Sequence, residues 1–185
     1  MKPTEGAEAP AAAFVHTRRV TWGETDAARI AYTARFLDFA MEATEAWFQD
    51  RLGLGWYEMN VDHGVGTPFV HARLDFRSPV TPRDTLSSAV RLVRLGGSSL
   101  RLAVTGRVGE RLVYEAELVC AFVDVASMRP IRVPDRFRPA LEAEVAIGSA
   151  WGPPLTVGPP APAPCYPVPA ARRAFPPGCG RRCPR

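Results

Sequence analysis

The stretch that decides the fold is "WGETDAARIAYTARFLDFAMEATEAWF", residues 22–48. Its first third is polar and turn-like, and the rest repeats apolar side chains at helical spacing, at Phe36, Ala40, Ala43 and Trp47. Gly53 and Gly55 then supply a stop signal. We therefore expect one helix of about 18 to 20 residues, beginning near Thr33 and about 30 Å long. Such a helix needs a large apolar surface to cover it.

The residues downstream of this helix predict strands that supply the cover. β-rich runs, two of them strictly alternating between apolar and polar side chains, occupy residues 69–76, 84–95, 99–108 and 111–125. The links 96–99 and 109–110 are short enough to form only antiparallel hairpins. With a first strand over 15–22, the sequence predicts an α+β fold, in which one antiparallel sheet of about five strands wraps around one long central helix.

Composition divides the chain into one domain and two flanking segments. The 185 residues are 46% hydrophobic, which suffices for one domain with a core. We expect a flexible N-terminus over 1–13, a domain over 14–144 and a disordered tail over 145–185. Eleven of the nineteen prolines lie after residue 150, and the tail holds five arginines but no acidic residue. The formal charge of +4 therefore belongs to the tail and not to the folded domain, and we expect no nucleic-acid partner.

Other residue types exclude further classes of protein. No stretch approaches the roughly 18 apolar residues of a membrane span, and the first 14 residues lack a long apolar run, so we expect a cytoplasmic protein without membrane association. Cys179 and Cys183 lack the second ligand pair of a structural zinc site. The three histidines show no metal-ligand spacing, so we expect no metal: His16, His63 and His71.

Three motifs resemble those of the hot-dog-fold acyl-CoA thioesterases of the 4-hydroxybenzoyl-CoA thioesterase type. They are "WGETDAARIAYT" at 22–33, "GVGTPFVHARLDFRSPV" at 64–80 and "RPIRVPDRF" at 129–137, within a match over about residues 14–142. The resemblance implies hydrolysis of an aryl or short to medium aliphatic acyl-CoA to the free acid and CoA. It implies no metal or organic cofactor, because CoA is part of the substrate. It also implies a homodimer or homotetramer, because half of each site comes from the facing protomer.

The same resemblance assigns the catalytic groups. Asp26 corresponds to the family's catalytic acid, which acts as a nucleophile or as a general base for water, and both roles remain open here. The backbone amide of Thr33 corresponds to the oxyanion donor. The chemistry agrees, because a thioester is already activated and an aspartate is ionised at neutral pH. Unpaired N–H groups at a helix start also favour developing negative charge.

The substrate-binding residues follow from matched positions and from nearby polar groups. Met41 corresponds to the acid that binds the ring hydroxyl in 4-hydroxybenzoyl enzymes, and because Met offers a phenol no hydrogen bond, we expect a different acyl group. In the family, Thr67 approaches the site from the neighbouring subunit. Arg129 matches a family arginine, and three further residues are assigned to acyl-CoA binding: Tyr32, Ser98 and Ser99.

Several departures keep alternative interpretations open. Where the family often has Pro and Gly after the catalytic acid, this chain has Ala27 and Arg29, which favours a non-catalytic acyl-CoA or acyl-carrier binding module as the main alternative. Thr33 is also compatible with a helix N-cap. Met41 is compatible with plain core packing. Glu24 is expected to be a solvated loop acid rather than a second catalytic carboxylate.

Overall fold

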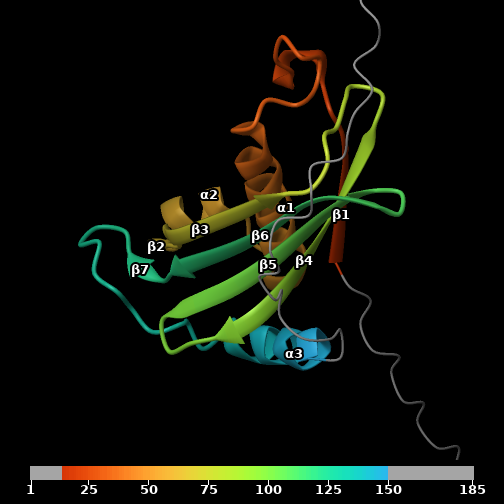
Figure 1. Cartoon of the computed structure of the whole chain (residues 1–185). Helices are drawn as coiled ribbons and strands as arrows, with labels where there is room; N and C mark the ends of the chain where they lie inside the picture. The colour runs from red at the N-terminus through yellow and green to blue at the C-terminus, as the bar shows by residue number, and fades with distance from the viewer. Residues whose placement is uncertain (1–13, 150–185) are drawn as a thin grey trace, which may run out of the picture.

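The computed structural model describes residues 14–149, which are built around one antiparallel sheet of five strands (Figure 1). The strand order is β1-β4-β5-β6-β3, and every neighbouring pair is antiparallel. The strands are β1 (Phe14–Arg19), β3 (Phe69–Phe76), β4 (Thr85–Leu95), β5 (Ser99–Val108) and β6 (Arg111–Ala121). With the long helix α1 (Arg35–Leu52) packed against the sheet, this confirms the predicted α+β fold.

The apolar periodicity of α1 explains its place against the sheet. The side chains that share one face of the helix are buried, namely Phe36, Phe39, Ala40, Ala43, Thr44, Trp47 and Phe48. The helix ends at Gly53, whose φ of 70° is the left-handed conformation that glycine adopts readily. It begins at Arg35, and its N-cap is Ala34, which makes no side-chain cap hydrogen bond. Thr33 therefore lies outside the helix and is not its cap.

Both predicted hairpins are present. β4 and β5 pair up to Leu95 and Leu100, and β5 and β6 pair up to Val108 and Arg111. Along β4 the exposure of side chains alternates, as the sequence pattern requires for a strand with one face against the core. These hairpins fix the order and direction of three strands, β4, β5 and β6.

The last predicted strand is shorter than expected. β6 ends at Ala121, and β7 (Val123–Asp124) instead pairs with β2 (Val65–Gly66) in a separate two-stranded sheet. Pro68, between β2 and β3, contributes to the break: its carbonyl accepts from the amide of Ala121 at 3.0 Å, but it has no N–H to return a hydrogen bond. Two short helices were also not predicted: the 3₁₀ helix η1 (Trp22–Glu24) and α2 (Trp56–Val61).

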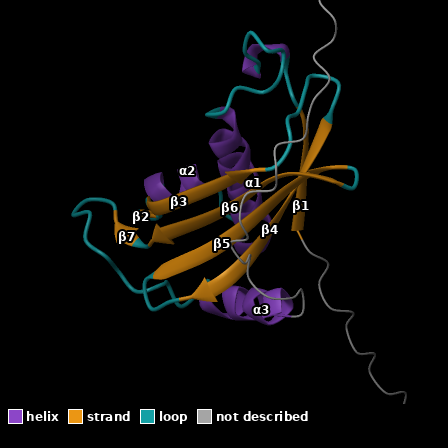
Figure 2. Cartoon of the chain, in the orientation of Figure 1, coloured by secondary structure: helices purple, strands orange, loops and turns teal. Residues whose placement is uncertain are grey.

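The helix α3 (Arg138–Ser149) lies along β4 and was not predicted either (Figure 2). The domain boundary expected at 144 falls inside it. Glu144 of α3 is 8% exposed, its carboxylate lies 2.7 Å from Nε of Arg51, and it accepts a hydrogen bond of 3.3 Å from Nε1 of Trp47. These contacts join α3 to α1. The predicted segment 1–13 and most of the predicted tail lie outside the described residues.

Within the described part of the chain, none of the helices has the length and apolar character that a membrane span requires.

Candidate functional site

A tight loop presents Asp26 at the end of the sheet where β1 finishes. Thr25 and Ala31 form an isolated antiparallel bridge that closes the loop at its base. Inside it, the amide of Asp26 donates to the carbonyl of Ile30 at 3.0 Å, and the amide of Arg29 donates to the carbonyl of Asp26 at 2.9 Å. The backbone of Asp26 is therefore held from both sides.

The side chain of Asp26 takes part in the turn and still faces solvent. Its Oδ1 accepts a hydrogen bond of 2.8 Å from the amide of Ala28, and the residue is exposed. Within residues 14–149 the structure gives this carboxylate no other hydrogen bond and no ion pair. One oxygen thus fixes the orientation of the carboxylate, and the other is available to a substrate or a water molecule.

The start of α1 leaves an amide available close in sequence to this loop. The amides of Arg35 and Phe36 donate to the carbonyls of Tyr32 and Thr33, at 2.8 and 3.3 Å. The amide of Thr33 itself has no acceptor among the described residues, and Thr33 is exposed. An N–H in this position, with the partial positive charge of the helix start behind it, suits a developing oxyanion.

The backbone of the Asp26 loop adopts, at Arg29, a conformation that usually requires glycine. Arg29 has a φ of 64°, in the left-handed region that only a few per cent of residues other than glycine adopt. Arg29 occupies the position at which the resemblance leads us to expect glycine. The substitution therefore leaves the left-handed turn in place.

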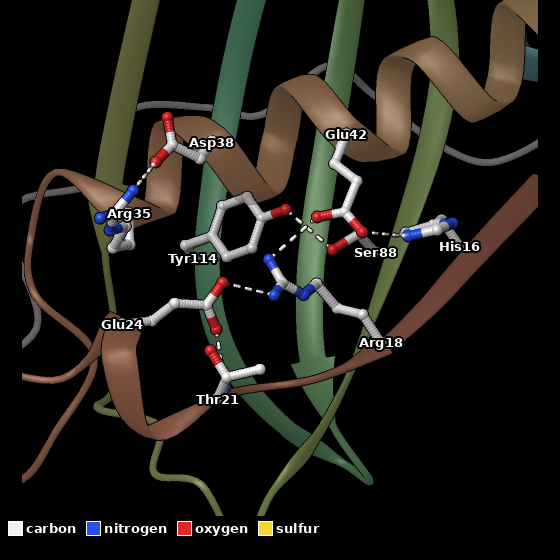
Figure 3. Close-up of polar contacts among 9 residues, drawn as sticks. All are labelled: His16, Arg18, Thr21, Glu24, Arg35, Asp38, Glu42, Ser88 and Tyr114. Carbon is white, nitrogen blue, oxygen red and sulfur yellow. Dashed lines mark hydrogen bonds and ion pairs between the residues drawn. The ribbon is translucent and has the colours of Figure 1, made fainter.

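Glu24 is not the solvated loop acid that we expected. Its side chain is only 17% exposed, and its carboxylate binds the guanidinium of Arg18 and the amide of Thr21 (Figure 3). Burial acts to raise the pKa of Glu24, but the hydrogen bonds from Thr21 and Arg18 together outweigh it, so the pKa lies below its usual value of 4.5. Glu24 is an ionised structural partner and not a second free carboxylate.

Sequence reasoning missed Arg18, although a signal was present. Phe14, His16 and Arg18 fall on the partly buried phase of β1, and Arg19 falls on the exposed phase. An arginine on the inward phase of a strand needs a buried acidic partner, because an unpaired buried charge is costly. Alternation along residues 14–19 therefore marks Arg18 as a residue with a specific role.

Four of the predicted substrate-binding residues gather at one place: Ser98, Ser99, Arg129 and Thr67. The carbonyl of Ser98 accepts from the amide of Phe122 at 2.8 Å, and the carbonyl of the adjacent Gly97 accepts from the amide of Val133 at 2.9 Å. These bonds lay the segment that follows Arg129 against the β4–β5 turn, where Ser99 also lies.

Arg129 and Thr67 complete this group. The carbonyl of Arg129 accepts from the amide of Asp124 at 3.0 Å, and its exposed guanidinium forms no ion pair with another described residue. Thr67, which is 7% exposed, directly follows β2, and β2 pairs with Val123 and Asp124.

These two groups lie at opposite ends of the sheet. β1 ends with Arg19 beside Thr85, the first residue of β4, so the Asp26 loop leaves from that end. The segment bearing Thr67 enters β3 beside Cys120, which also pairs with Leu100 at the other end. A strand of ten residues spans about 33 Å. One protomer therefore does not bring the predicted catalytic residues together with Thr67, Arg129 and the two serines.

Tyr32 and Met41 lie on the Asp26 side. Tyr32 is 54% exposed and precedes Thr33, and Met41 is partly buried on α1, two helical turns further along. Leu37, one turn before Met41, is exposed. Apolar surface on this flank of α1 thus stays uncovered next to the loop. Within residues 14–149 no group of three or more His, Cys, Asp or Glu side chains is placed to hold a metal ion.

Comparison with solved structures supports the α+β fold described above. A solved thioesterase-superfamily protein from Jannaschia sp. CCS1 is 38% identical, with a TM-score of 0.70 over 76% of this chain and 98% of that one. A Staphylococcus aureus protein solved in complex with CoA is 14% identical, with a TM-score of 0.72 over 83% and 94% of the two chains. The latter likeness concerns the fold alone.

A curated relative and a family model identify the family. The 1,4-dihydroxy-2-naphthoyl-CoA hydrolase of Nostoc punctiforme is 26% identical over 129 residues, which are 70% of this chain and 86% of that protein. The model of the thioesterase-like superfamily matches residues 20–141, which include the Asp26 loop, α1 and the whole sheet except β1. The chain therefore belongs to the thioesterase-like superfamily and is a hot-dog-fold thioester hydrolase.

Proposed function

We propose that this protein hydrolyses an acyl-CoA to the free acid and CoA at a site built on Asp26 and the Thr33 amide. The observation that carries the proposal is the pairing of an oriented, exposed carboxylate with an unpaired helix-start amide seven residues later. The name of the Nostoc relative and the CoA bound by the Staphylococcus protein support CoA thioesters as the substrate class.

The chemistry needs few groups. As a nucleophile, an Asp26 oxygen attacks the thioester carbon, the C–S bond breaks, CoA leaves as a thiolate, and water then hydrolyses the acyl-aspartate anhydride. As a general base, Asp26 takes a proton from the water that attacks the same carbon, the C–S bond breaks, and CoA leaves as a thiolate that takes up a proton. In both routes the Thr33 amide donates to the oxyanion, a contribution of about 10² to 10³ in rate. The proposal includes no metal or organic cofactor.

The separation of the two groups of residues supports a homodimer that pairs through β3. In the described chain β3 pairs only with β6, and its outer edge carries exposed apolar side chains, with Val70 65% and Phe76 51% exposed. Antiparallel pairing of β3 with its copy would bring the partner's Thr67 and Arg129 end to the Asp26 end of the first protomer. A homotetramer would contain two such dimers.

The positions of Met41 and Tyr32 indicate which acyl group the site accepts. Both flank the start of α1, where the acyl chain of a substrate held by Asp26 would pass. The Nostoc relative is named for a hydroxylated aryl-CoA, which supports an aryl acyl group. A methionine gives a ring hydroxyl no hydrogen-bond partner, so the proposal favours an unsubstituted aryl or a short to medium aliphatic acyl group. The expected location is the cytoplasm.

A non-catalytic acyl-CoA binding module is the rival function. The unusual "AAR" after Asp26 favoured it, because that sequence put the path of the loop in question. The left-handed conformation of Arg29 weakens this argument, because the turn that glycine would form is kept.

A panel of acyl-CoAs, followed with a thiol reagent, separates the two functions. The proposal expects kcat/KM of at least about 10⁴ M⁻¹s⁻¹ for one or more substrates. Tight binding of acyl-CoA without release of thiol would support the binding module instead. Repeating the panel with Met41→Asp tests the acyl pocket: the ratio of kcat/KM for benzoyl-CoA to that for 4-hydroxybenzoyl-CoA should fall. An unchanged ratio in a folded variant would remove Met41 from the pocket.

A further inference from the structure

Four polar side chains form a chain of contacts next to the segment that leads into the Asp26 loop, with two ion pairs made by Arg18 and a hydrogen bond between Glu42 and His16: Glu24, Arg18, Glu42 and His16 (Figure 3). We propose that Arg18 is a positioning residue for thioester hydrolysis, because it fixes the Asp26 loop relative to the start of α1. The inference rests on the proposed function of Asp26 and the Thr33 amide. It adds a residue that contacts neither the substrate nor the reacting atoms.

Arg18 is enclosed by partners from two other elements. Its side chain is 14% exposed, with Nη2 2.5 Å from Oε1 of Glu24 and Nη1 2.9 Å from Oε2 of Glu42. The guanidinium carbon lies 4.3 Å from the ring centroid of Phe39, on the buried face of α1. One side chain of β1 is thus bound to η1 and to α1 together.

Glu24 is hydrogen-bonded to residues on both sides of the Asp26 loop. Its Oε2 accepts from the amide of Thr21 at 2.7 Å, which fixes the carboxylate against its own helical turn. Its carbonyl accepts from the amide of Tyr32 at 2.8 Å, directly before Thr33. Asp26 follows Glu24 by two residues. Glu24 therefore sets where the loop departs toward Asp26 and where it returns to Thr33.

Glu42 connects the same arginine to the helix. It lies on α1, and its other carboxylate oxygen is 3.2 Å from Nε2 of His16 on β1 (Figure 3). Thr33 lies two residues before α1, and its carbonyl accepts from the amide of Phe36 in the first turn. Arg18 therefore joins the loop to the helix whose start holds the oxyanion donor. A shift of the loop would change the distance between the Asp26 carboxylate and this amide, and a misplacement of about 1 Å can cost 10²-fold in rate.

The geometry requires arginine at this position. The two carboxylates contact different nitrogens of one planar guanidinium, so their relative positions are set by its rigid fork. A lysine keeps the charge but offers a single nitrogen on a flexible stem. Arg18→Lys therefore removes the fixed geometry while leaving the charge balance of the four groups intact.

Kinetics of matched variants test the inference. Arg18→Lys and the milder Glu24→Gln should each lower kcat about 30-fold or more with KM changed less than about 3-fold, because the substrate-binding surface is kept. The control is Arg51→Lys, which disturbs another partly buried pair, Arg51–Glu144, at the far end of α1. It should lower Tm but keep kcat within about 2-fold. The proposal would be overturned if Arg51→Lys and Arg18→Lys lost the same amount of Tm and Arg51→Lys lowered kcat as much as Arg18→Lys.

Two further measurements separate this inference from the proposed function. In an Asp26→Asn background, Arg18→Lys should cause less than about 3-fold additional loss, because the residual rate no longer depends on the carboxylate that Arg18 positions. An undiminished loss would assign Arg18 a merely structural role. Hydrogen exchange at the Tyr32 amide needs no activity: it should rise about tenfold or more in Arg18→Lys and stay unchanged in Arg51→Lys. Unchanged exchange in Arg18→Lys overturns the inference even if no acyl-CoA is turned over.

Discussion

Arg29 shows how much of the site depends on the backbone of single residues. Its left-handed φ of 64° lets the chain turn back from Asp26 toward Ile30, whose carbonyl accepts from the amide of Asp26. A side chain with a Cβ adopts this conformation at a cost of roughly 1–2 kcal/mol. The chain therefore carries local strain one turn away from its proposed catalytic acid.

Replacing Arg29 should expose that strain. We expect Arg29→Gly to raise the free energy of unfolding by up to about 1 kcal/mol, because the gain in the turn exceeds the entropy that glycine adds to the unfolded chain. Arg29→Val should lower it by more than about 1 kcal/mol, and Arg29→Ala, the control for the lost side chain, should change it little. Urea unfolding measures all three. If Arg29→Gly lowered the free energy of unfolding, the contacts of the Arg29 side chain, and not its backbone conformation, would determine stability at this position.

At the scale of elements, β1, η1 and α1 meet through charged groups and not only through the apolar core. Arg18 from β1 contacts Glu24 at the end of η1 and Glu42 in the second turn of α1 (Figure 3). The lowered pKa of Glu24 follows from hydrogen bonds that outweigh its burial. Stability and pH are therefore linked through this contact.

The sign of that link is fixed by the direction of the pKa shift. Folded Glu24 holds its proton less tightly than unfolded Glu24, so its stabilisation is complete above about pH 4.5 and is lost as pH falls through the lower, folded pKa. The difference in free energy of unfolding between wild type and Glu24→Gln should be largest near about pH 6 and shrink toward about pH 3. Denaturant unfolding at both pH values measures it. A difference that grows on acidification would contradict the assignment.

The elements differ in how far their sequences predict them. The span of α1 and the two hairpins followed from local signals, namely the apolar period ending at Gly53 and the short links between alternating runs. α3 did not, because its burial depends on distant partners such as the Glu144 contact with Arg51. β7 does not continue β6 as one strand, because Pro68 on the neighbouring segment has no N–H to donate at the point where β6 ends. This effect acts between segments that are distant in the sequence.

The candidate site was predictable only where a motif marks it. Asp26 and Thr33 stand in one short stretch, so a resemblance to that stretch predicts a role for both. The ion pairs of Glu24 and Arg18 depend on which way the strand side chains face, and the sequence alone suggested a solvated acid at Glu24. Alternation along β1 marks Arg18, but its partners Glu24 and Glu42 are apparent only from the folded structure.

At the scale of the whole molecule, the separation of Asp26 from Thr67 and Arg129 is the feature that calls for a second copy. Both groups lie at sheet ends, about one strand length apart, and β3 offers an edge with exposed apolar residues between them. The hydrolase is thus expected to be active only as an assembly, with each site composed of residues from two protomers.

Blocking the β3 edge should separate the protomers and abolish turnover. We expect Val70→Lys to give a folded monomer with kcat/KM reduced by at least about 10²-fold, because a charged edge resists strand pairing and the site loses its partner residues. The matched control is Val15→Lys on β1, an edge strand whose Val15 is 49% exposed, and it should leave both mass and activity unchanged. Light scattering with size-exclusion chromatography measures the mass. A fully active Val70→Lys monomer would refute the composite site.

The central claim, that Asp26 performs the chemistry, is tested most directly by kcat for thiol release from the best acyl-CoA in Asp26→Asn. An amide neither attacks the thioester nor takes a proton from water, so kcat should fall by at least about 10³ while acyl-CoA binding and Tm change little. Asp38→Asn, which removes an exposed carboxylate 2.9 Å from Nη1 of Arg35, should keep wild-type kcat. An Asp26→Asn enzyme that retains a tenth of wild-type kcat would contradict the claim.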